Sequence, residues 1–256
     1  MRPPETNIHS WGHESRCDWF DGPVSNPLRP QAVALLAELS TNGANSAVWS
    51  DLRDELYYRH IGEHACAALP ALAALAGQGS PLTRMRAIEL AADLLARADP
   101  HAGDARERYA ADIAALLVLV RADLARKYPD EDHESDVFVY RMRSMLAFEG
   151  ETEWSRRLAE LLAGEFETKC PECSAVMYVA IGAHGVFTCW DDDSLADDVD
   201  ETDLVPASPA RLTGLAHRLH TLAVTARQPV LARRLTYLFG RTTCPRNAHE
   251  FTPAGL

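Results

Sequence analysis

Two cysteine–proline motifs near the end of the chain constrain its fold more than any other feature. The first reads Cys170-Pro-Glu-Cys173, and the second reads Cys244-Pro-Arg-Asn-Ala-His249. A Cys-x-x-Cys turn points two sulfurs at one ion, and thiolate and imidazole are ligands that zinc prefers. Three thiols and one imidazole therefore predict a closed, structural zinc site, which would tie the segment at residue 170 to the chain end.

The composition of this metal site leaves alternatives open. Asn247 stands where the second motif would need a cysteine to repeat Cys-x-x-Cys. Cys189 is an alternative to His249 as the fourth ligand, and free thiols are the alternative to a metal. If His249 does not bind, the ion has an open position, and metal-assisted catalysis becomes chemically feasible.

Length and composition permit one large domain or two small ones. The chain has 256 residues, of which 47% are hydrophobic, enough for a substantial core. It has no uncharged apolar run of about 18 residues, so we expect no membrane span. Residues 1–6 lack the apolar segment of a signal peptide, so we expect a cytoplasmic protein. In that compartment, six cysteines favour metal ligands or free thiols over disulfides. The chain has only two lysines among many alanines and arginines, which is typical of a high-GC bacterium.

Charge is distributed unevenly along the chain. The formal net charge is −12, and eight acidic residues fall within 191–203, where there is no basic residue. We interpret this stretch as a solvated loop, with contact to a basic partner as the alternative. An overall acidic chain is a poor nucleic-acid binder, because attraction to phosphates drives most of that affinity. Residues 206–256 carry seven arginines and one acid, so a local basic face stays possible there.

The chain divides into three regions. Residues 1–29 are punctuated by proline and glycine and predict an irregular lead-in. Residues 30–164 show helical periodicity with short breaks. They predict helices from 30 to about 41, from 46 to about 57, and over 63–76, 82–97, 105–127, 131–148 and 152–162. Residues 165–256 predict two strands, 175–181 and 186–190, then the acidic loop and two helices, 209–225 and 230–239.

Two parts of the helical pattern resemble a known family. Residues 49–60, which run from Trp-Ser-Asp-Leu to Leu-Tyr-Tyr-Arg-His, precede an alanine-rich segment, 65–72, with an internal proline. This order resembles the opening of bacterial HEAT-like repeat proteins, and Leu-Thr-Tyr-Leu-Phe-Gly at 235–240 is similar to their C-terminal end. The resemblance implies a mostly α fold of stacked helical hairpins, here with a small zinc-ribbon-like β-hairpin element. It also implies a scaffold that binds partners or neutralises toxins; a few such proteins are DNA glycosylases.

Two further constellations are candidate metal sites. His60, Glu63 and His64 form an H-x-x-E-H pattern, which on a helix would give two ligands and a general base. Gly62 and the preceding Tyr-Tyr-Arg indicate an inter-helix turn instead, so capping or surface histidines are favoured. A second group, spaced four apart, consists of His9, His13 and Cys17. Its glycine and prolines argue against a regular helix there, so exposed side chains are favoured over ligands.

The sequence favours a function in binding a protein partner. The chain contains no phosphate loop, nucleophile elbow or dinucleotide fingerprint. We expect a non-catalytic scaffold for a protein partner, as an inhibitor or immunity-type factor, with structural Zn²⁺. The alternative is a metal-dependent or nucleic-acid-acting enzyme on the same scaffold.

Overall fold

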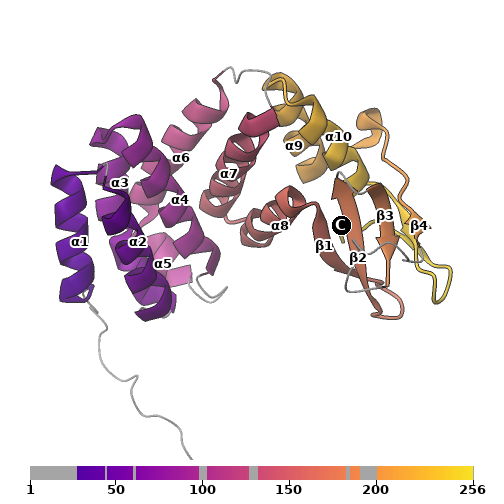
Figure 1. Ribbon diagram of the computed structural model, residues 1–256, viewed down its shortest axis with the longest axis horizontal. Coiled ribbons are helices and arrows are strands. Elements are labelled where there is room, and N and C mark those ends of the chain that lie inside the picture. The colour runs from indigo at the N-terminus through magenta and orange to yellow at the C-terminus, as the bar shows by residue number, and fades with distance from the viewer. Residues whose placement is uncertain are drawn as a thin grey trace, which may run out of the picture.

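The structure, a computed structural model, describes residues 28–43, 45–59, 62–97, 103–126, 132–182, 185–190 and 201–255. Within these ranges the protein is mostly helical, with ten α-helices and a small antiparallel sheet toward the C-terminal end. The helices follow one another along an arch that ends in the sheet (Figure 1). The expected lead-in, apart from residues 28 and 29, lies outside the described residues, and so does the acidic stretch at 191–200.

Eight α-helices and two shorter helical turns precede the sheet. They are α1 (Pro30–Thr41), α2 (Ser46–Asp54), the π-helical η1 (Glu55–Arg59), the 3-10-helical η2 (Gly62–Ala68), α3 (Leu69–Gln78), α4 (Pro81–Arg97), α5 (Gly103–Arg108), α6 (Ala110–Leu124), α7 (Asp132–Glu149) and α8 (Thr152–Ala163). Helix α1 packs on α2, α3 on α4, α6 on α7, and α7 on α8, while α4 also packs on α7. Several helices that are neighbours in the sequence therefore pack on each other, within a region that is helical as expected.

Local sequence signals explain where several helices begin. The side chain of Asn45 caps α2 and accepts hydrogen bonds from two backbone N–H groups of its first turn, at 3.1 and 3.5 Å. Pro70, the proline within the alanine-rich segment, lies at the start of a helix rather than inside one. It lies in the first turn of α3, where its missing N–H costs nothing, and the 3-10-helical η2 occupies the residues before it.

A four-stranded antiparallel sheet follows the helices in the order β1-β2-β3-β4. Its strands are β1 (Glu165–Lys169), β2 (Val176–Gly182), β3 (Gly185–Cys189) and β4 (Thr202–Asp203). Strands β2 and β3 confirm the predicted hairpin. Strand β4 pairs with β3, so the end of the acidic stretch is part of the sheet rather than a solvated loop.

The chain end returns to this sheet after two more helices. The elements are η3 (Pro209–Arg211), α9 (Gly214–Thr225), α10 (Pro229–Leu238), β5 (Thr242–Thr243) and β6 (Glu250–Phe251). Helices α9 and α10 pack on each other, and α10 contacts β2. The hydroxyl of Thr168 in β1 donates to the backbone oxygen of Pro253 at 2.8 Å, which places the last residues against the first strand.

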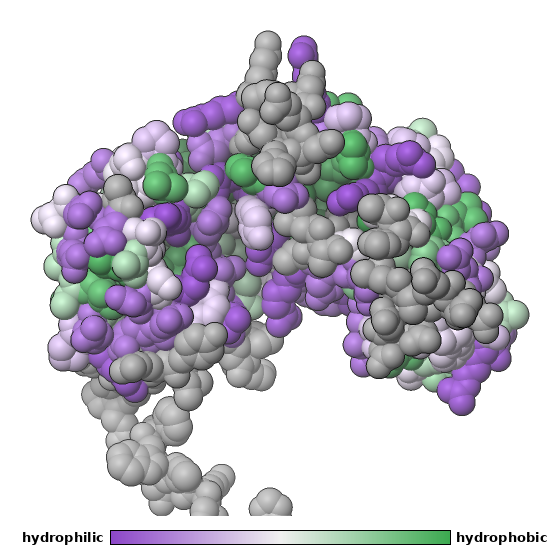
Figure 2. All heavy atoms as spheres, viewed as in Figure 1, coloured by the Kyte–Doolittle hydropathy of each residue, from purple (hydrophilic) through white to green (hydrophobic). Residues whose placement is uncertain are grey.

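Among the described residues, the buried side chains form one large cluster and two small ones. The large cluster runs through the helices from α1 to α10 and includes Phe166 and Val179 of the sheet. One small cluster surrounds the two cysteine–proline motifs and contains Met177 and Phe251 beside the sulfurs. Hydrophilic residues cover most of the described surface in the view of Figure 2, and hydrophobic ones show only as separate patches. No described helix is long and apolar enough to cross a bilayer.

Candidate functional site

The first cysteine–proline motif joins β1 to β2 through a tight turn. The backbone N–H of Cys170 donates to the oxygen of Ala175 at 2.9 Å, and the N–H of Ser174 donates to the oxygen of Cys170 at 2.8 Å. Ser174 has φ of +57°, the left-handed conformation that closes the turn. This geometry turns the Cys170 and Cys173 side chains to the same side.

The second motif, between β5 and β6, forms a turn with the same two backbone hydrogen bonds. The N–H of Cys244 donates to the oxygen of His249 at 2.8 Å, and the N–H of Ala248 donates to the oxygen of Cys244 at 2.8 Å. Ala248 also has φ of +57°. By position, Asn247 therefore corresponds to the second cysteine of the first turn, and His249 corresponds to Ala175.

The two turns bring three sulfurs together. The Sγ atoms of Cys170, Cys173 and Cys244 all lie within 4.8 Å of one another, and those of Cys173 and Cys244 are 3.7 Å apart. Cys170 and Cys244 are buried, and Cys173 is half-buried. Because soft thiolates at this separation suit a single soft or borderline ion, the three cysteines can hold one metal ion.

Hydrogen bonds around the first turn separate the acidities of its two thiols. Burial opposes ionisation of Cys170, but donors from the backbone of Cys173 and Glu172 and from the neighbouring thiols outweigh it and lower its pKa. A backbone donor from Ala175 favours ionisation of Cys173, but burial and the adjacent thiols raise its pKa above the ordinary value. Because metal ligands bind as thiolates, an ion must displace the protons of these thiols to engage them all.

The amide of Asn247 lies beside the three sulfurs. The Oδ1 atom of Asn247 lies 3.9 Å from Cys170 Sγ. His249 is outside the group of mutually close ligand atoms; its Nδ1 lies 3.4 Å from Glu172 Oε2, and its side chain is 40% exposed. Cys189, the alternative fourth ligand, belongs to the other small cluster, with Ala180 and Phe187.

The remaining sequence candidates lie where little is described. His9, His13, Cys17 and His60 fall outside the described residues. Glu63 and His64 belong to η2, a 3-10 helix, and their side chains are not described. These constellations stay predictions.

A polar pocket among the helices is a second candidate site, which the sequence did not indicate. It has a volume of about 360 Å³, and its walls come from α2, η1, α4, α7 and α8. The lining residues are Arg53, Tyr57, Glu89, Ala92, Asp93, Tyr140, Arg143, Ser144 and Ser155. A larger cavity of about 680 Å³, between α1, α3 and the start of α4, has no charged residue in its lining. The smaller pocket is therefore the better candidate for binding a polar or charged group.

Asp93 is the centre of the hydrogen bonding in this pocket. Its Oδ2 accepts from the Tyr57 hydroxyl at 2.6 Å, and its Oδ1 accepts from Arg143 at 3.4 Å. The guanidinium of Arg97 lies 4.0 Å from the centre of the Tyr57 ring. Burial, together with Asp93, raises the pKa of Tyr57 far above its ordinary value. Tyr57 is therefore a neutral donor at physiological pH.

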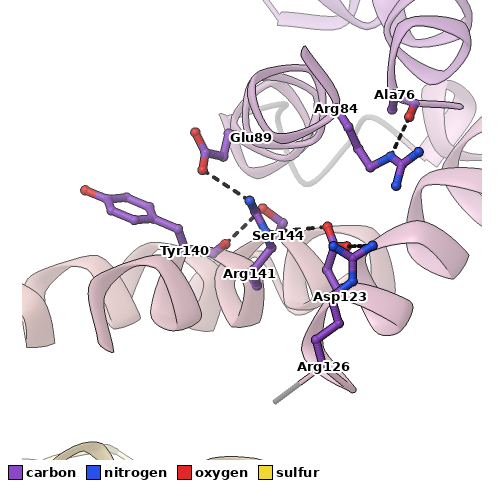
Figure 3. Close-up of polar contacts among 8 residues, drawn as sticks. All are labelled: Ala76, Arg84, Glu89, Asp123, Arg126, Tyr140, Arg141 and Ser144. Atoms are coloured by element: carbon purple, nitrogen blue, oxygen red, sulfur yellow. Dashed lines mark hydrogen bonds and ion pairs between the residues drawn. The ribbon is translucent and has the colours of Figure 1, made fainter. Parts of the chain in front are cut away.

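Arg141 of α7 joins this helix to α4 and α6 (Figure 3). Its guanidinium is 3.2 Å from Glu89 Oε1 on α4 and 3.7 Å from Asp123 Oδ2 on α6. Arg126 approaches Asp123 at 3.2 Å. Burial raises the pKa of Glu89, and Arg141 opposes that rise. The ion pairs of Arg141 thus link Glu89, which lines the pocket, to Asp123 and Arg126 on the side of α6.

The spacing on two helices could have indicated part of this pocket. Glu89 and Asp93 are four residues apart on α4, and Tyr140 and Ser144 are four apart on α7, so each pair shares a helix face. Which faces meet depends on the stacking of the helices, which this spacing does not specify.

Comparison of the chain with family models, with curated proteins and with solved structures returned no match.

Proposed function

We propose that the protein is a non-catalytic scaffold of the HEAT-like type that binds a protein partner, and that one structural zinc ion holds its C-terminal part together. An inhibitor or immunity-type factor is the form of scaffold that we favour. The zinc and the partner are separate parts of the proposal, because the cysteine cluster and the polar pocket lie in different core clusters of the chain.

The polar pocket carries the proposal of partner binding. Both carboxylates in its lining are already engaged: Asp93 accepts from Tyr57 and Arg143, and Glu89 pairs with Arg141, which lies outside the lining. A general base must have its carboxylate free to reach a substrate proton. Fixed, paired charges suit recognition of a partner's side chains instead, because complementary charge gives specificity.

The donor set supports zinc as the ion. Three cysteine sulfurs within 4.8 Å of one another are soft ligands, typical of zinc, copper(I) and iron–sulfur sites rather than of magnesium or calcium. Two Cys-Pro turns that each close on their own backbone bonds are rigid frames for a structural site.

Capture of partners by matched variants tests the binding proposal. Arg53 lines the pocket and is exposed, so Arg53→Glu reverses a charge there without disturbing the core. Arg211 in η3 is also exposed and does not line the pocket, so Arg211→Glu is the control. We expect a partner from the source organism that both the wild type and the control retain and Arg53→Glu loses. Recovery of the same proteins by all three would contradict the proposal.

A metal-dependent enzyme is the second candidate, and one observation favours it. The cysteine cluster brings together three protein ligands rather than four, and zinc enzymes keep one position for water or substrate.

A further inference from the structure

The equivalence of the two turns identifies residue 247 as the fourth corner of the metal site. Each turn has a cysteine whose N–H is bonded to the oxygen of the residue five positions later, and a left-handed residue four positions after that cysteine. In the first turn the residue before the left-handed one is Cys173, a member of the sulfur group. In the second turn the same place belongs to Asn247, whose Oδ1 is 3.9 Å from Cys170 Sγ.

Asn247 does not replace the missing thiolate as a ligand of comparable strength. An amide oxygen is neutral, whereas zinc in protein sites takes thiolate, imidazole or carboxylate donors. The amide is also engaged: its Nδ2 donates to Glu172 Oε2 at 2.8 Å, and its Oδ1 accepts from the N–H of His249 at 3.2 Å.

His249 is also held away from this corner. Its backbone oxygen is fixed by the N–H of Cys244, at the place that Ala175 takes in the first turn. Its ring pairs with Glu172 at 3.4 Å, and 40% of its side chain is exposed. The imidazole therefore lies outside the ligand group as a neighbour of the site.

We propose that the metal held by the three cysteines has an open fourth position, which exchanges small neutral donors such as water or an imidazole nitrogen. This inference rests on the proposed metal site. Charge selects the class of ligand, because a divalent ion with three thiolates carries a net negative charge, and Glu172 adds another beside it. An anionic donor would meet repulsion, whereas a neutral one would not. Solvent reaches the site because Cys173 is half-buried and Asn247 is exposed.

Cobalt(II) and imidazole test this position. The reduced, full-length protein is loaded with one equivalent of cobalt, and its visible spectrum is followed while imidazole is added. We expect the wild type and His249→Ala to change with the same dependence on imidazole concentration. Asn247→Cys supplies a fourth thiolate, so we expect no response from it, and its sulfur-to-cobalt charge-transfer band should be stronger by about one third, in proportion to the thiolates bound.

The outcomes separate this inference from the metal site itself. If imidazole changes the spectrum of His249→Ala but not that of the wild type, His249 is the fourth ligand and the inference is overturned. If imidazole changes neither spectrum, the site is closed and the inference is overturned as well. Failure of the wild type to take up cobalt or zinc would instead refute the metal site, and the inference with it.

Discussion

Arg141 is one of the few charged residues that are buried among those the structure describes. Only 7% of it is exposed, and its charge is balanced by Glu89 and Asp123. Removing a charge from solvent costs several kcal/mol, which buried partners repay only when both are present. A change that removes Arg141 therefore leaves two carboxylates without their main counter-charge.

Arg141→Leu tests this cost. We expect a loss of about 3 kcal/mol in the free energy of unfolding, near the lower limit for a broken buried pair, because Asp123 keeps Arg126. Urea unfolding measures the loss. The control is Arg121→Leu, which removes an exposed arginine from Glu149; because Glu149 keeps Arg218, this change should cost less than about 1 kcal/mol. Equal losses in the two variants would contradict the role assigned to Arg141.

Titration of the single residue Glu89 makes the free energy of unfolding depend on pH. Its pKa is raised in the folded protein, chiefly by burial, from an ordinary value of 4.5. The folded state then binds this proton more tightly than the unfolded chain does, so the free energy of unfolding falls as pH rises above about 4.5. Glu89→Gln removes the titration, and we expect a flatter dependence of stability on pH in that window. Urea unfolding at a series of pH values measures it; an unchanged slope would exclude Glu89 as the cause.

At the scale of elements, the connection from α10 to β5 depends on one close backbone approach. Val205 and Arg241 exchange two backbone hydrogen bonds of 2.8 Å, directly beside Gly240. A Cβ atom at position 240 would overlap the carbonyl oxygen of Val205. Only glycine fits here, because the obstacle is backbone and has no rotamer by which to move away.

Gly240→Ala is the corresponding variant. We expect it to lower the free energy of unfolding by about 1–3 kcal/mol, the usual cost of overpacking. The control is Gly77→Ala in α3, where an added Cβ meets nothing within 4 Å and should stabilise the helix by up to about 1 kcal/mol. Thermal unfolding of both variants measures the difference, and a harmless Gly240→Ala would show that the connection can move.

The sequence predicted the elements that have strong local signals. It did not predict strands that form only because they pair with a neighbouring strand. Helix periodicity and the apolar runs at 175–190 are local, so the helices and the β2–β3 hairpin follow from them. Strand β1 is short and mostly charged, and only Phe166 and Thr168 are buried within it. Its strand structure comes from its register against β2, a property of the assembled sheet.

The same distinction applies to the sites. The cysteine cluster was predictable because Cys-x-x-Cys and a distant Cys-Pro are recognisable metal-binding motifs. The fourth ligand position was not, because it depends on how the two folded turns lie relative to each other. The polar pocket was not predictable, since Tyr57, Asp93 and Arg143 come from three segments that meet only when the helices stack.

On the scale of the whole molecule, the two parts of the protein are stabilised differently. The helices share one extensive buried cluster, while the cysteine–proline motifs have only a small apolar cluster of their own. Such a small cluster offsets little of the entropy of ordering its segments, so the proposed metal ion would be the main cross-link there. Metal removal should therefore loosen residues 165–255 and leave the helices from α1 to α7 intact.

Amide hydrogen exchange with and without a strong zinc chelator tests this central claim most directly. We expect chelation to speed exchange in β1, β2, β5 and β6 by at least about tenfold, and to leave α3, α4 and α7 unchanged, because they open independently of the metal. Cys244→Ser, which lacks one ligand, should exchange alike with and without chelator. Protection of the four strands that does not change on chelation, in protein with verified zinc content, would contradict the account.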